Sequence, residues 1–277
     1  MRVLLFALTN IAVLAMAAVS MAVLTALGVI PPDAPLVGLL VWCALFGFGG
    51  AILSLAMSKA IAKRSTRARV IERPSTNTEA WLLETVSRQA QALGIKTPEV
   101  AVFPAPDPNA FATGMFRNSA LVAVSTGLLG TLEKREVEAV LGHEMAHVAN
   151  GDMVTLALIQ GVVNTFVLFI ARIVASQFER GRFLIYMALQ VALGVLASTL
   201  VAWFSRRREF RADAGGAQLE GAGAMADALE RLRTFKEPAR LPESLAAFGI
   251  RSGGLNKLWS THPPLEERIK RLRGAAS

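Results

Sequence analysis

The sequence contains a single cysteine and only three histidines among its 277 residues. Because Cys43 stands alone, no disulfide can form within the chain, and the protein needs no oxidising compartment. The position of Cys43 inside an apolar run is typical of a small buried hydrophobe rather than of a catalytic thiol. Any chemistry that requires an imidazole must therefore come from His143, His147 or His262.

Charged residues are also scarce, at 18% of the chain, whereas hydrophobic residues make up 53%. A typical soluble domain has about 25% charged and about 45–50% apolar residues, so lipid must solvate much of this chain. The net charge is +8, but the basic residues cluster directly after Ala56 and after Phe204, beside apolar runs. This pattern indicates membrane anchoring and does not indicate binding of nucleic acid.

Four apolar runs are each long enough for a membrane-crossing helix, which needs roughly 20 residues. They are Val3–Ile30, Leu36–Met57, Met153–Ser176 and Phe183–Phe204. The first run is much longer than the apolar region of a signal peptide, so we expect an uncleaved anchor. The third run contains Gln160 and Arg172, and we expect it to be tilted or to turn these polar groups inward.

The distribution of basic residues predicts how the chain crosses the membrane. The turn between the first two runs has no lysine or arginine, whereas Lys59, Lys63 and Arg64 follow the second run. Both ends of this hairpin should therefore lie in the cytoplasm. We predict a transmembrane hairpin at 1–57, a cytoplasmic part at 58–152, a second apolar hairpin at 153–204 that spans the membrane or is embedded in it, and a C-terminal cytoplasmic part at 205–277.

The polar segments predict a mainly α fold with a small β-sheet, of the α+β class. Residues 75–94 have the periodicity of an amphipathic helix, and residues 98–103 and 119–125 have the composition of short strands. Between the two strands we expect an irregular loop at 104–114, which would suit the rim of a groove. Four glycines after the last apolar run should mark helix ends: Gly215, Gly216, Gly221 and Gly223.

Two histidines lie four residues apart in the segment HEMAH, inside a predicted helix that starts with Thr131 as N-cap. At this spacing His143 and His147 lie on one face of the helix and can hold one Zn²⁺. Glu144 lies about 100° around the axis from His143, where it can act on a water molecule without ligating the metal. The pattern predicts a zinc site with Glu144 as general base.

A catalytic zinc usually has three protein ligands and one open position. The segment EFRAD offers Glu209 and Asp213, again four residues apart. We favour Glu209 as the third ligand over His262 or Asp152, with Asp213 behind it orienting a histidine. Without HEMAH, the same acids would be interpreted as partners of nearby arginines on a solvated face.

His262 precedes two prolines that constrain the backbone. One interpretation of this residue is a hydrogen bond at a helix cap or in the core. The other is donation to the oxyanion that forms during attack on an amide, with Arg268 as a second positive group.

Seven segments in order, among them PDPNAFATG, VLGHEMAHVANGD, EFRADAGGA and THPPLEERI, resemble the HtpX family of bacterial membrane zinc metalloproteases. The resemblance covers nearly the whole chain. It implies a gluzincin-like fold combined with transmembrane helices, one Zn²⁺ on His143, His147 and Glu209, and Glu144 as base. It also implies quality control of unfolded or damaged inner-membrane proteins under stress. Relatives of the family include CAAX prenyl proteases, but this chain has fewer apolar runs, which disfavours a prenylated substrate.

The leading prediction is thus a zinc endopeptidase of the bacterial inner membrane, with its active site in the cytoplasm. We expect an extended substrate to add beside the strand at 119–125, with 109–114 on the opposite rim. One alternative is a membrane scaffold whose zinc is purely structural, and such a protein would not need Glu144. A transporter is a weaker alternative, suggested by Gln160 and Arg172, because the apolar runs hold no paired acids. The oligomeric state is not predicted.

Overall fold

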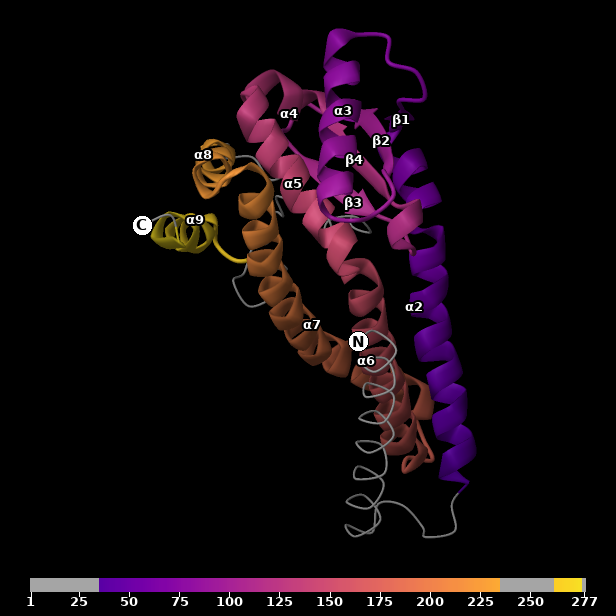
Figure 1. The fold of residues 1–277 in the computed structure, drawn as a ribbon. Coiled ribbons are helices and arrows are strands. Elements are labelled where there is room, and N and C mark those ends of the chain that lie inside the picture. The colour runs from indigo at the N-terminus through magenta and orange to yellow at the C-terminus, as the bar shows by residue number, and fades with distance from the viewer. Residues whose placement is uncertain (1–34, 235–261, 276–277) are drawn as a thin grey trace. The chain divides into compact units, whose positions relative to one another are not determined.

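The computed structural model describes residues 35–234 and 262–275 of the chain. The first predicted apolar run, Val3–Ile30, lies outside these ranges. The described residues form helices and one small sheet (Figure 1). Along the chain the elements are α2 Leu36–Thr66, β1 Arg69–Val70, α3 Asn77–Ala92, β2 Glu99–Phe103, β3 Ala110–Thr113, η1 Arg117–Ser119, β4 Leu121–Ser125, α4 Thr126–Thr131, α5 Lys134–Asn150, α6 Asp152–Ser176, α7 Arg182–Glu220, α8 Ala222–Arg233 and α9 Leu265–Ala275.

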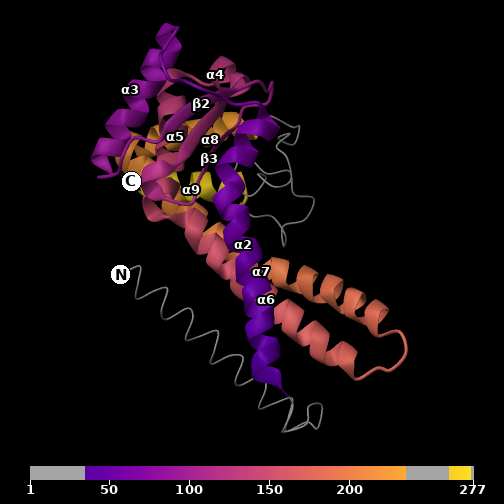
Figure 2. The ribbon, with the colours of Figure 1, turned by 90° about the vertical axis from the view of Figure 1, so that its right-hand side faces the viewer.

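The chain forms two compact units. Of the described residues, 35–53 and 157–198 belong to the apolar unit, and 54–156, 199–234 and 262–275 belong to the mixed unit. The helices α2, α6 and α7 each contain an 18-residue window with a mean hydropathy between 2.0 and 2.3, long and apolar enough to cross a membrane. Figure 2 shows α6 and the first part of α7 as a helical hairpin. The boundaries predicted for the four sequence segments stay a prediction.

The sheet of the mixed unit has the strand order β1-β2-β4-β3. β2 and β4 are parallel, with Glu99 opposite Leu121, whereas β3 pairs antiparallel with β4. One face of the sheet carries a cluster of fully or nearly fully buried side chains, to which Ala62 of α2 belongs: Ala101, Phe103, Phe111, Leu121 and Ala123. α3 and α5 also pack against the sheet, so little of it meets solvent.

The amphipathic helix predicted for residues 75–94 is confirmed as α3. Thr76 is its N-cap and accepts a hydrogen bond from the Glu79 N–H over 3.1 Å. Leu82, Val86 and Ala90 are fully buried, as expected for residues on one helical face.

Three local predictions are wrong. Thr131 ends the short helix α4, and the N-cap of α5 is Glu133, which forms a capping box with Glu136. The loop predicted at 104–114 contains the strand β3. Of the four glycines, Gly221 is an N-cap with a positive φ, but Gly215 and Gly216 lie inside α7 and Gly223 lies inside α8.

The predicted place of the substrate is also wrong. β4 is hydrogen-bonded to β2 along one edge and to β3 along the other, so it cannot accept another strand. β3 is the outer strand of the described sheet on that side. On this side of the sheet an extended peptide could therefore add to β3, and not beside residues 119–125.

Candidate metal centre

The helix α5 is built to hold its histidines rigidly. Its capping box satisfies the first backbone N–H groups, and the acidic side chains of Glu133 and Glu136 lie at the positive end of the helix dipole. Gly151, with a φ of 67°, ends the helix in the left-handed conformation that glycine adopts without strain. His143 and Glu144 are each 1% exposed and His147 is 8% exposed. All three side chains are thus fixed inside the mixed unit.

α7 crosses α5 at very short range. A methyl group added to Gly216 would lie 3.0 Å from the backbone nitrogen of His143, and one added to Gly215 would lie 2.6 Å from the Cβ of Ala146. These glycines let the two backbones approach, and Glu209, two turns earlier on α7, then reaches the histidines of α5.

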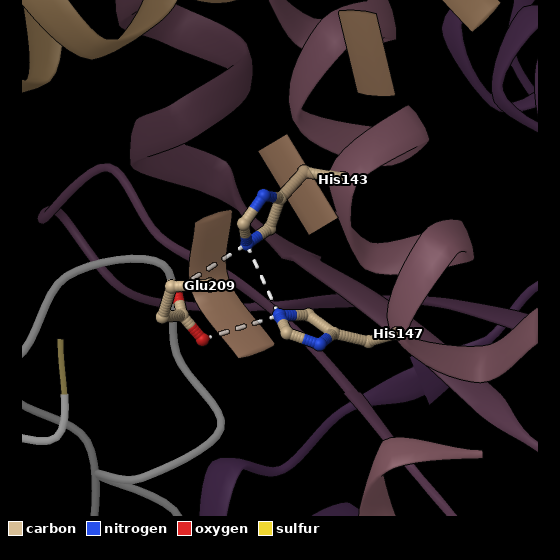
Figure 3. A group of neighbouring side chains, drawn as sticks. All are labelled: His143, His147 and Glu209. Carbon is tan, nitrogen blue, oxygen red and sulfur yellow. Dashed lines mark hydrogen bonds and ion pairs between the residues drawn. The ribbon is translucent and has the colours of Figure 1, made fainter. Parts of the chain in front are cut away.

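Three side chains that can ligate a metal converge from these two helices, His143 and His147 from α5 and Glu209 from α7, as Figure 3 shows. The Nε2 atoms of His143 and His147 lie 3.2 Å apart. Glu209 places Oε1 3.2 Å from Nε2 of His147 and Oε2 3.5 Å from Nε2 of His143. Two ligands on one tetrahedral zinc, each at about 2.0–2.1 Å, would lie roughly 3.4 Å apart. The donor set therefore fits a single Zn²⁺.

Carboxylates hold the other nitrogen of each ring. Asp213 Oδ1 lies 3.0 Å from Nδ1 of His143, and Asp152 Oδ2 lies 2.7 Å from Nδ1 of His147. When each Nδ1–H donates to its carboxylate, the lone pair of each Nε2 is left for a metal ion. The expected partnership of Asp213 with a histidine is present, and Asp152 and His262 lie outside the donor group.

Two residues near the C-terminal end support the acids of α7. Arg268 of α9 donates to both oxygens of Asp213, over 2.9 Å and 2.6 Å, and is fully buried. His262 places Nδ1 2.8 Å from Oε2 of Glu209. Both residues are candidates in the sequence, and in the structure each contacts an acid of the centre, His262 the carboxylate of Glu209 and Arg268 that of Asp213.

One contributor was missed in the sequence. Arg208 donates from Nη1 to the backbone carbonyl oxygen of Asp152 over 2.8 Å and from Nη2 to Ser205 over 3.1 Å. Arg208 thereby fixes the start of α6, and with it the carboxylate of Asp152, which faces His147. The sequence places Arg208 in a basic cluster after an apolar run, and nothing in that cluster distinguishes it from its neighbours.

The electrostatics of the centre follow from burial among acids. Burial lowers the pKa of His147, but the negative charge of Glu209 and a hydrogen bond with Asp152 outweigh it and raise the pKa to about 10. Burial also lowers the pKa of His143, and hydrogen bonds with Asp213 and Glu209 again produce a net rise. Burial raises the pKa of the Glu144 carboxyl. The cluster of buried acids and histidines therefore favours bound positive charge, either protons or a metal ion.

Comparison with known proteins agrees with this chemistry. A sequence model described as "Peptidase family M48" matches residues 76–276. Protease HtpX of Thioalkalivibrio sulfidiphilus is 52% identical over 289 residues, which cover 98% of this chain and 98% of the relative. Protease HtpX of Xanthomonas axonopodis pv. citri is 56% identical over 290 residues, covering 99% and 98%.

A solved structure shares the fold. The crystal structure of S. mikatae Ste24p matches with a TM-score of 0.62 at 17% identity and covers 91% of this chain. This chain spans only 64% of that longer protein, and at such low identity the likeness is one of fold alone. The predicted fold class, mainly α with a small sheet and apolar helices, is confirmed. From the family match and the near-full-length relatives, the chain belongs to peptidase family M48, among the HtpX proteases, and is a membrane metalloprotease.

Proposed function

We propose that this metalloprotease is a zinc-dependent endopeptidase of the bacterial inner membrane that cleaves misfolded or damaged membrane proteins under stress. The observation that carries the chemistry is the convergence of two imidazole nitrogens and one carboxylate at the separations of a tetrahedral zinc site. Two histidines, one glutamate and one open position form a common catalytic zinc arrangement. The proposed ligands are His143, His147 and Glu209.

Glu144 is the proposed general base. Within the described part of the chain, its buried Oε1 has no hydrogen-bond partner, although Glu144 lies within the electrostatic influence of both histidines. A buried carboxylate oxygen without a partner costs stability, so a functional reason for it is expected. When bound, zinc would supply a Lewis acid that polarises the peptide carbonyl and lowers the pKa of water. Glu144 then accepts the proton of the attacking water and returns it to the leaving amine.

In this proposal Arg268 and His262 act on two acids of α7, Asp213 and the ligand Glu209. Arg268 is committed to Asp213 by two hydrogen bonds, so we assign it to positioning that acid and, through it, His143. His262 contacts Glu209 through Nδ1. The alternative role of His262 as an oxyanion donor would use its other ring nitrogen, Nε2, and stays a prediction.

The substrate would bind to β3. The carbonyl oxygen of Asn109 accepts a hydrogen bond from the N–H of Ser125 in β4. In an antiparallel ladder the backbone N–H and C=O groups of Phe111 then also point toward β4, whereas those of Ala110 and Ala112 point away from it, toward the open edge. Asn109, next to this edge, is buried, and its Nδ2 has no hydrogen-bond partner among the described residues. Backbone pairing with β3 would recognise an extended chain with little regard to its sequence.

The location follows from the distribution of charge. Basic residues follow the apolar part of α2 at Lys59, Lys63 and Arg64, which favours a cytoplasmic mixed unit. A protease tethered in this way would meet unfolded cytoplasmic segments of membrane proteins, so the proposed partners are those proteins and the lipid bilayer.

A Glu144→Gln variant tests the chemistry. The full chain, purified in detergent with a chelator and then supplied with zinc, should cleave unfolded casein, whereas Glu144→Gln should lose at least about 100-fold in rate and still bind one zinc per chain. Glu84→Gln, at an exposed position of α3, serves as the matched control and should cleave normally. Equal cleavage by Glu144→Gln would exclude the assigned base, and absence of cleavage by the wild type would favour a scaffold with structural zinc.

A further inference from the structure

Among the described residues, α2, α6 and α7 line an open groove of about 430 Å³. It is lined from α2, α6 and α7 by Gly38, Leu39, Trp42, Cys43, Phe46, Leu168, Arg172 and Tyr186. The volume lies in the range of about 300–1,000 Å³ that is typical of sites for small ligands.

The walls of the groove are held by close packing of α2 against α6. A methyl group added to Gly47 would lie 2.5 Å from Thr165 Oγ1, and one added to Gly161 would lie 2.6 Å from the ring of Phe48. Beside these contacts, Cys43, Phe169 and Ile173 form a buried cluster. Small residues at such crossings are what lets membrane helices pack tightly, so the groove is a built feature of the unit.

Arg172 is the one charged residue that lines this groove. Among the described residues, no hydrogen bond or ion pair involves its guanidinium. A charged side chain within an apolar segment is costly unless it meets an opposite charge or reaches the interface. No acid lines the groove and Arg172 is exposed, so its guanidinium can meet an anion from outside the described part of the chain.

The polar groups of the groove lie near one set of helix ends. Arg172 is four residues before the end of α6 at Ser176, a rise of roughly 6 Å. Tyr186 is in the second turn of α7, and Trp42 is in the second turn of α2. Tryptophan and tyrosine are enriched at the level of lipid headgroups, which is also the depth that an arginine reaches with its long side chain.

We propose that this groove binds one anionic phospholipid, with the phosphate on Arg172 and an acyl chain against Trp42, Phe46 and Leu168. Arginine forms strong, charge-assisted hydrogen bonds with phosphate oxygens. In a zwitterionic lipid the headgroup amine offsets the phosphate charge, so a guanidinium without an internal partner selects a lipid with net negative charge. The site does not depend on the metal centre or on the proposed substrate.

Native mass spectrometry of the full chain in detergent tests the proposal, with phosphatidylglycerol and phosphatidylcholine of identical acyl chains as probes. The wild type should retain phosphatidylglycerol over phosphatidylcholine by about fivefold, the effect of one basic residue near a membrane surface. Arg172→Gln should lose this preference. Arg180→Gln removes the same charge from the neighbouring loop, outside the groove, and should keep it.

A second measurement needs no change at Arg172. Phosphatidylglycerol with brominated chains should quench tryptophan fluorescence more than brominated phosphatidylcholine, and Trp42→Phe should remove the excess quenching. Equal retention of both lipids by all three proteins would mean a general lipid coat and would overturn the proposal. A disulfide between Cys43 and the thiol introduced by Val23→Cys, with no lipid preference, would place the first apolar run of the chain in the groove and would also overturn it.

Discussion

Each histidine of the metal centre is oriented by an acid from another element. His147 faces Asp152, the first residue of α6, and His143 faces Asp213 of α7. Because an imidazole that donates from Nδ1 must offer its lone pair at Nε2, these two acids decide which nitrogen each ring presents. Metal affinity should therefore depend on residues that do not touch the metal.

The variant Asp152→Asn tests this dependence. It preserves the size of the side chain but removes the negative charge that strengthens the hydrogen bond with His147. We expect zinc affinity to fall by about 10-fold to 100-fold, as is usual for the loss of such a partner. Competition with a fluorescent zinc chelator measures the change, and Asp227→Asn, an exposed acid of α8, is the control. Unchanged affinity in Asp152→Asn would remove Asp152 from the metal centre.

The sequence predicts the part of this site that is local. His143, Glu144 and His147 are related by the helical repeat alone, and Asp213 follows Glu209 by one turn. The contact between Asp152 and His147 is different, because it depends on the direction in which the chain leaves Gly151. Arg208 binds a backbone carbonyl 56 residues away. No periodicity encodes such a contact, so the sequence could not reveal it.

At the scale of elements, the metal centre depends on how closely α7 approaches α5. The sequence predicted helix ends at Gly215 and Gly216 because glycine weakens an isolated helix. In the structure the helix continues through both, since packing on α5 compensates for their low propensity and requires the absence of a side chain. Gly221, where no neighbour lies within 4 Å of an added methyl group, is the position that ends the helix. Propensity alone could not separate these two uses of glycine.

Gly215→Ala should disturb the metal centre from a distance. Its methyl group would lie 2.6 Å from the Cβ of Ala146, which forces α7 away from α5 and moves Glu209 from the histidines. Overpacking of this kind costs about 1–3 kcal/mol. Thermal unfolding should show the loss of stability, and zinc competition should show weaker binding.

Gly223→Ala is the matched control for that change. The added methyl group would meet only the end of the Arg135 side chain, at 3.4 Å, inside a helix where alanine is favoured. Because Gly223 lies in the first turn of α8, this variant should bind zinc normally and should unfold no more easily than the wild type. If Gly215→Ala behaves like Gly223→Ala, the close approach of α7 does not position Glu209.

At the scale of the whole molecule, charge explains why the mixed unit needs a cation. Four buried acids surround the centre, and two buried arginines accompany them: Glu144, Asp152, Glu209 and Asp213, with Arg208 and Arg268. With neutral histidines the sum is four negative and two positive charges, a net charge of −2 that one divalent ion cancels. Buried charge without compensation is strongly destabilising. Folding and metal binding should therefore be coupled.

The coupling should depend on pH in a defined direction. Without metal, protons supply the positive charge, and the pKa of His147 is raised to about 10 in the folded state. A raised pKa stabilises the folded state fully below the ordinary histidine value of about 6.5, and this contribution is lost as the pH rises toward 10. Zinc requires neutral imidazoles, so it competes less with protons at higher pH. The stabilisation by zinc should thus increase from pH 6.5 to pH 8.5.

Thermal unfolding of the purified chain, with zinc and with a chelator, measures this difference. The free zinc concentration is held fixed at 100 times the dissociation constant measured at pH 6.5. At that pH zinc should add about 2.7 kcal/mol, a rise of roughly 5–10 °C in the melting temperature, and at pH 8.5 it should add more. The chelated protein should lose stability as the pH rises, whereas the zinc-loaded protein should not. His147→Ala should abolish both the zinc effect and most of the pH dependence, because it removes a ligand and the titrating group together. A zinc effect that shrinks with rising pH would show that protons do not replace the metal in this centre.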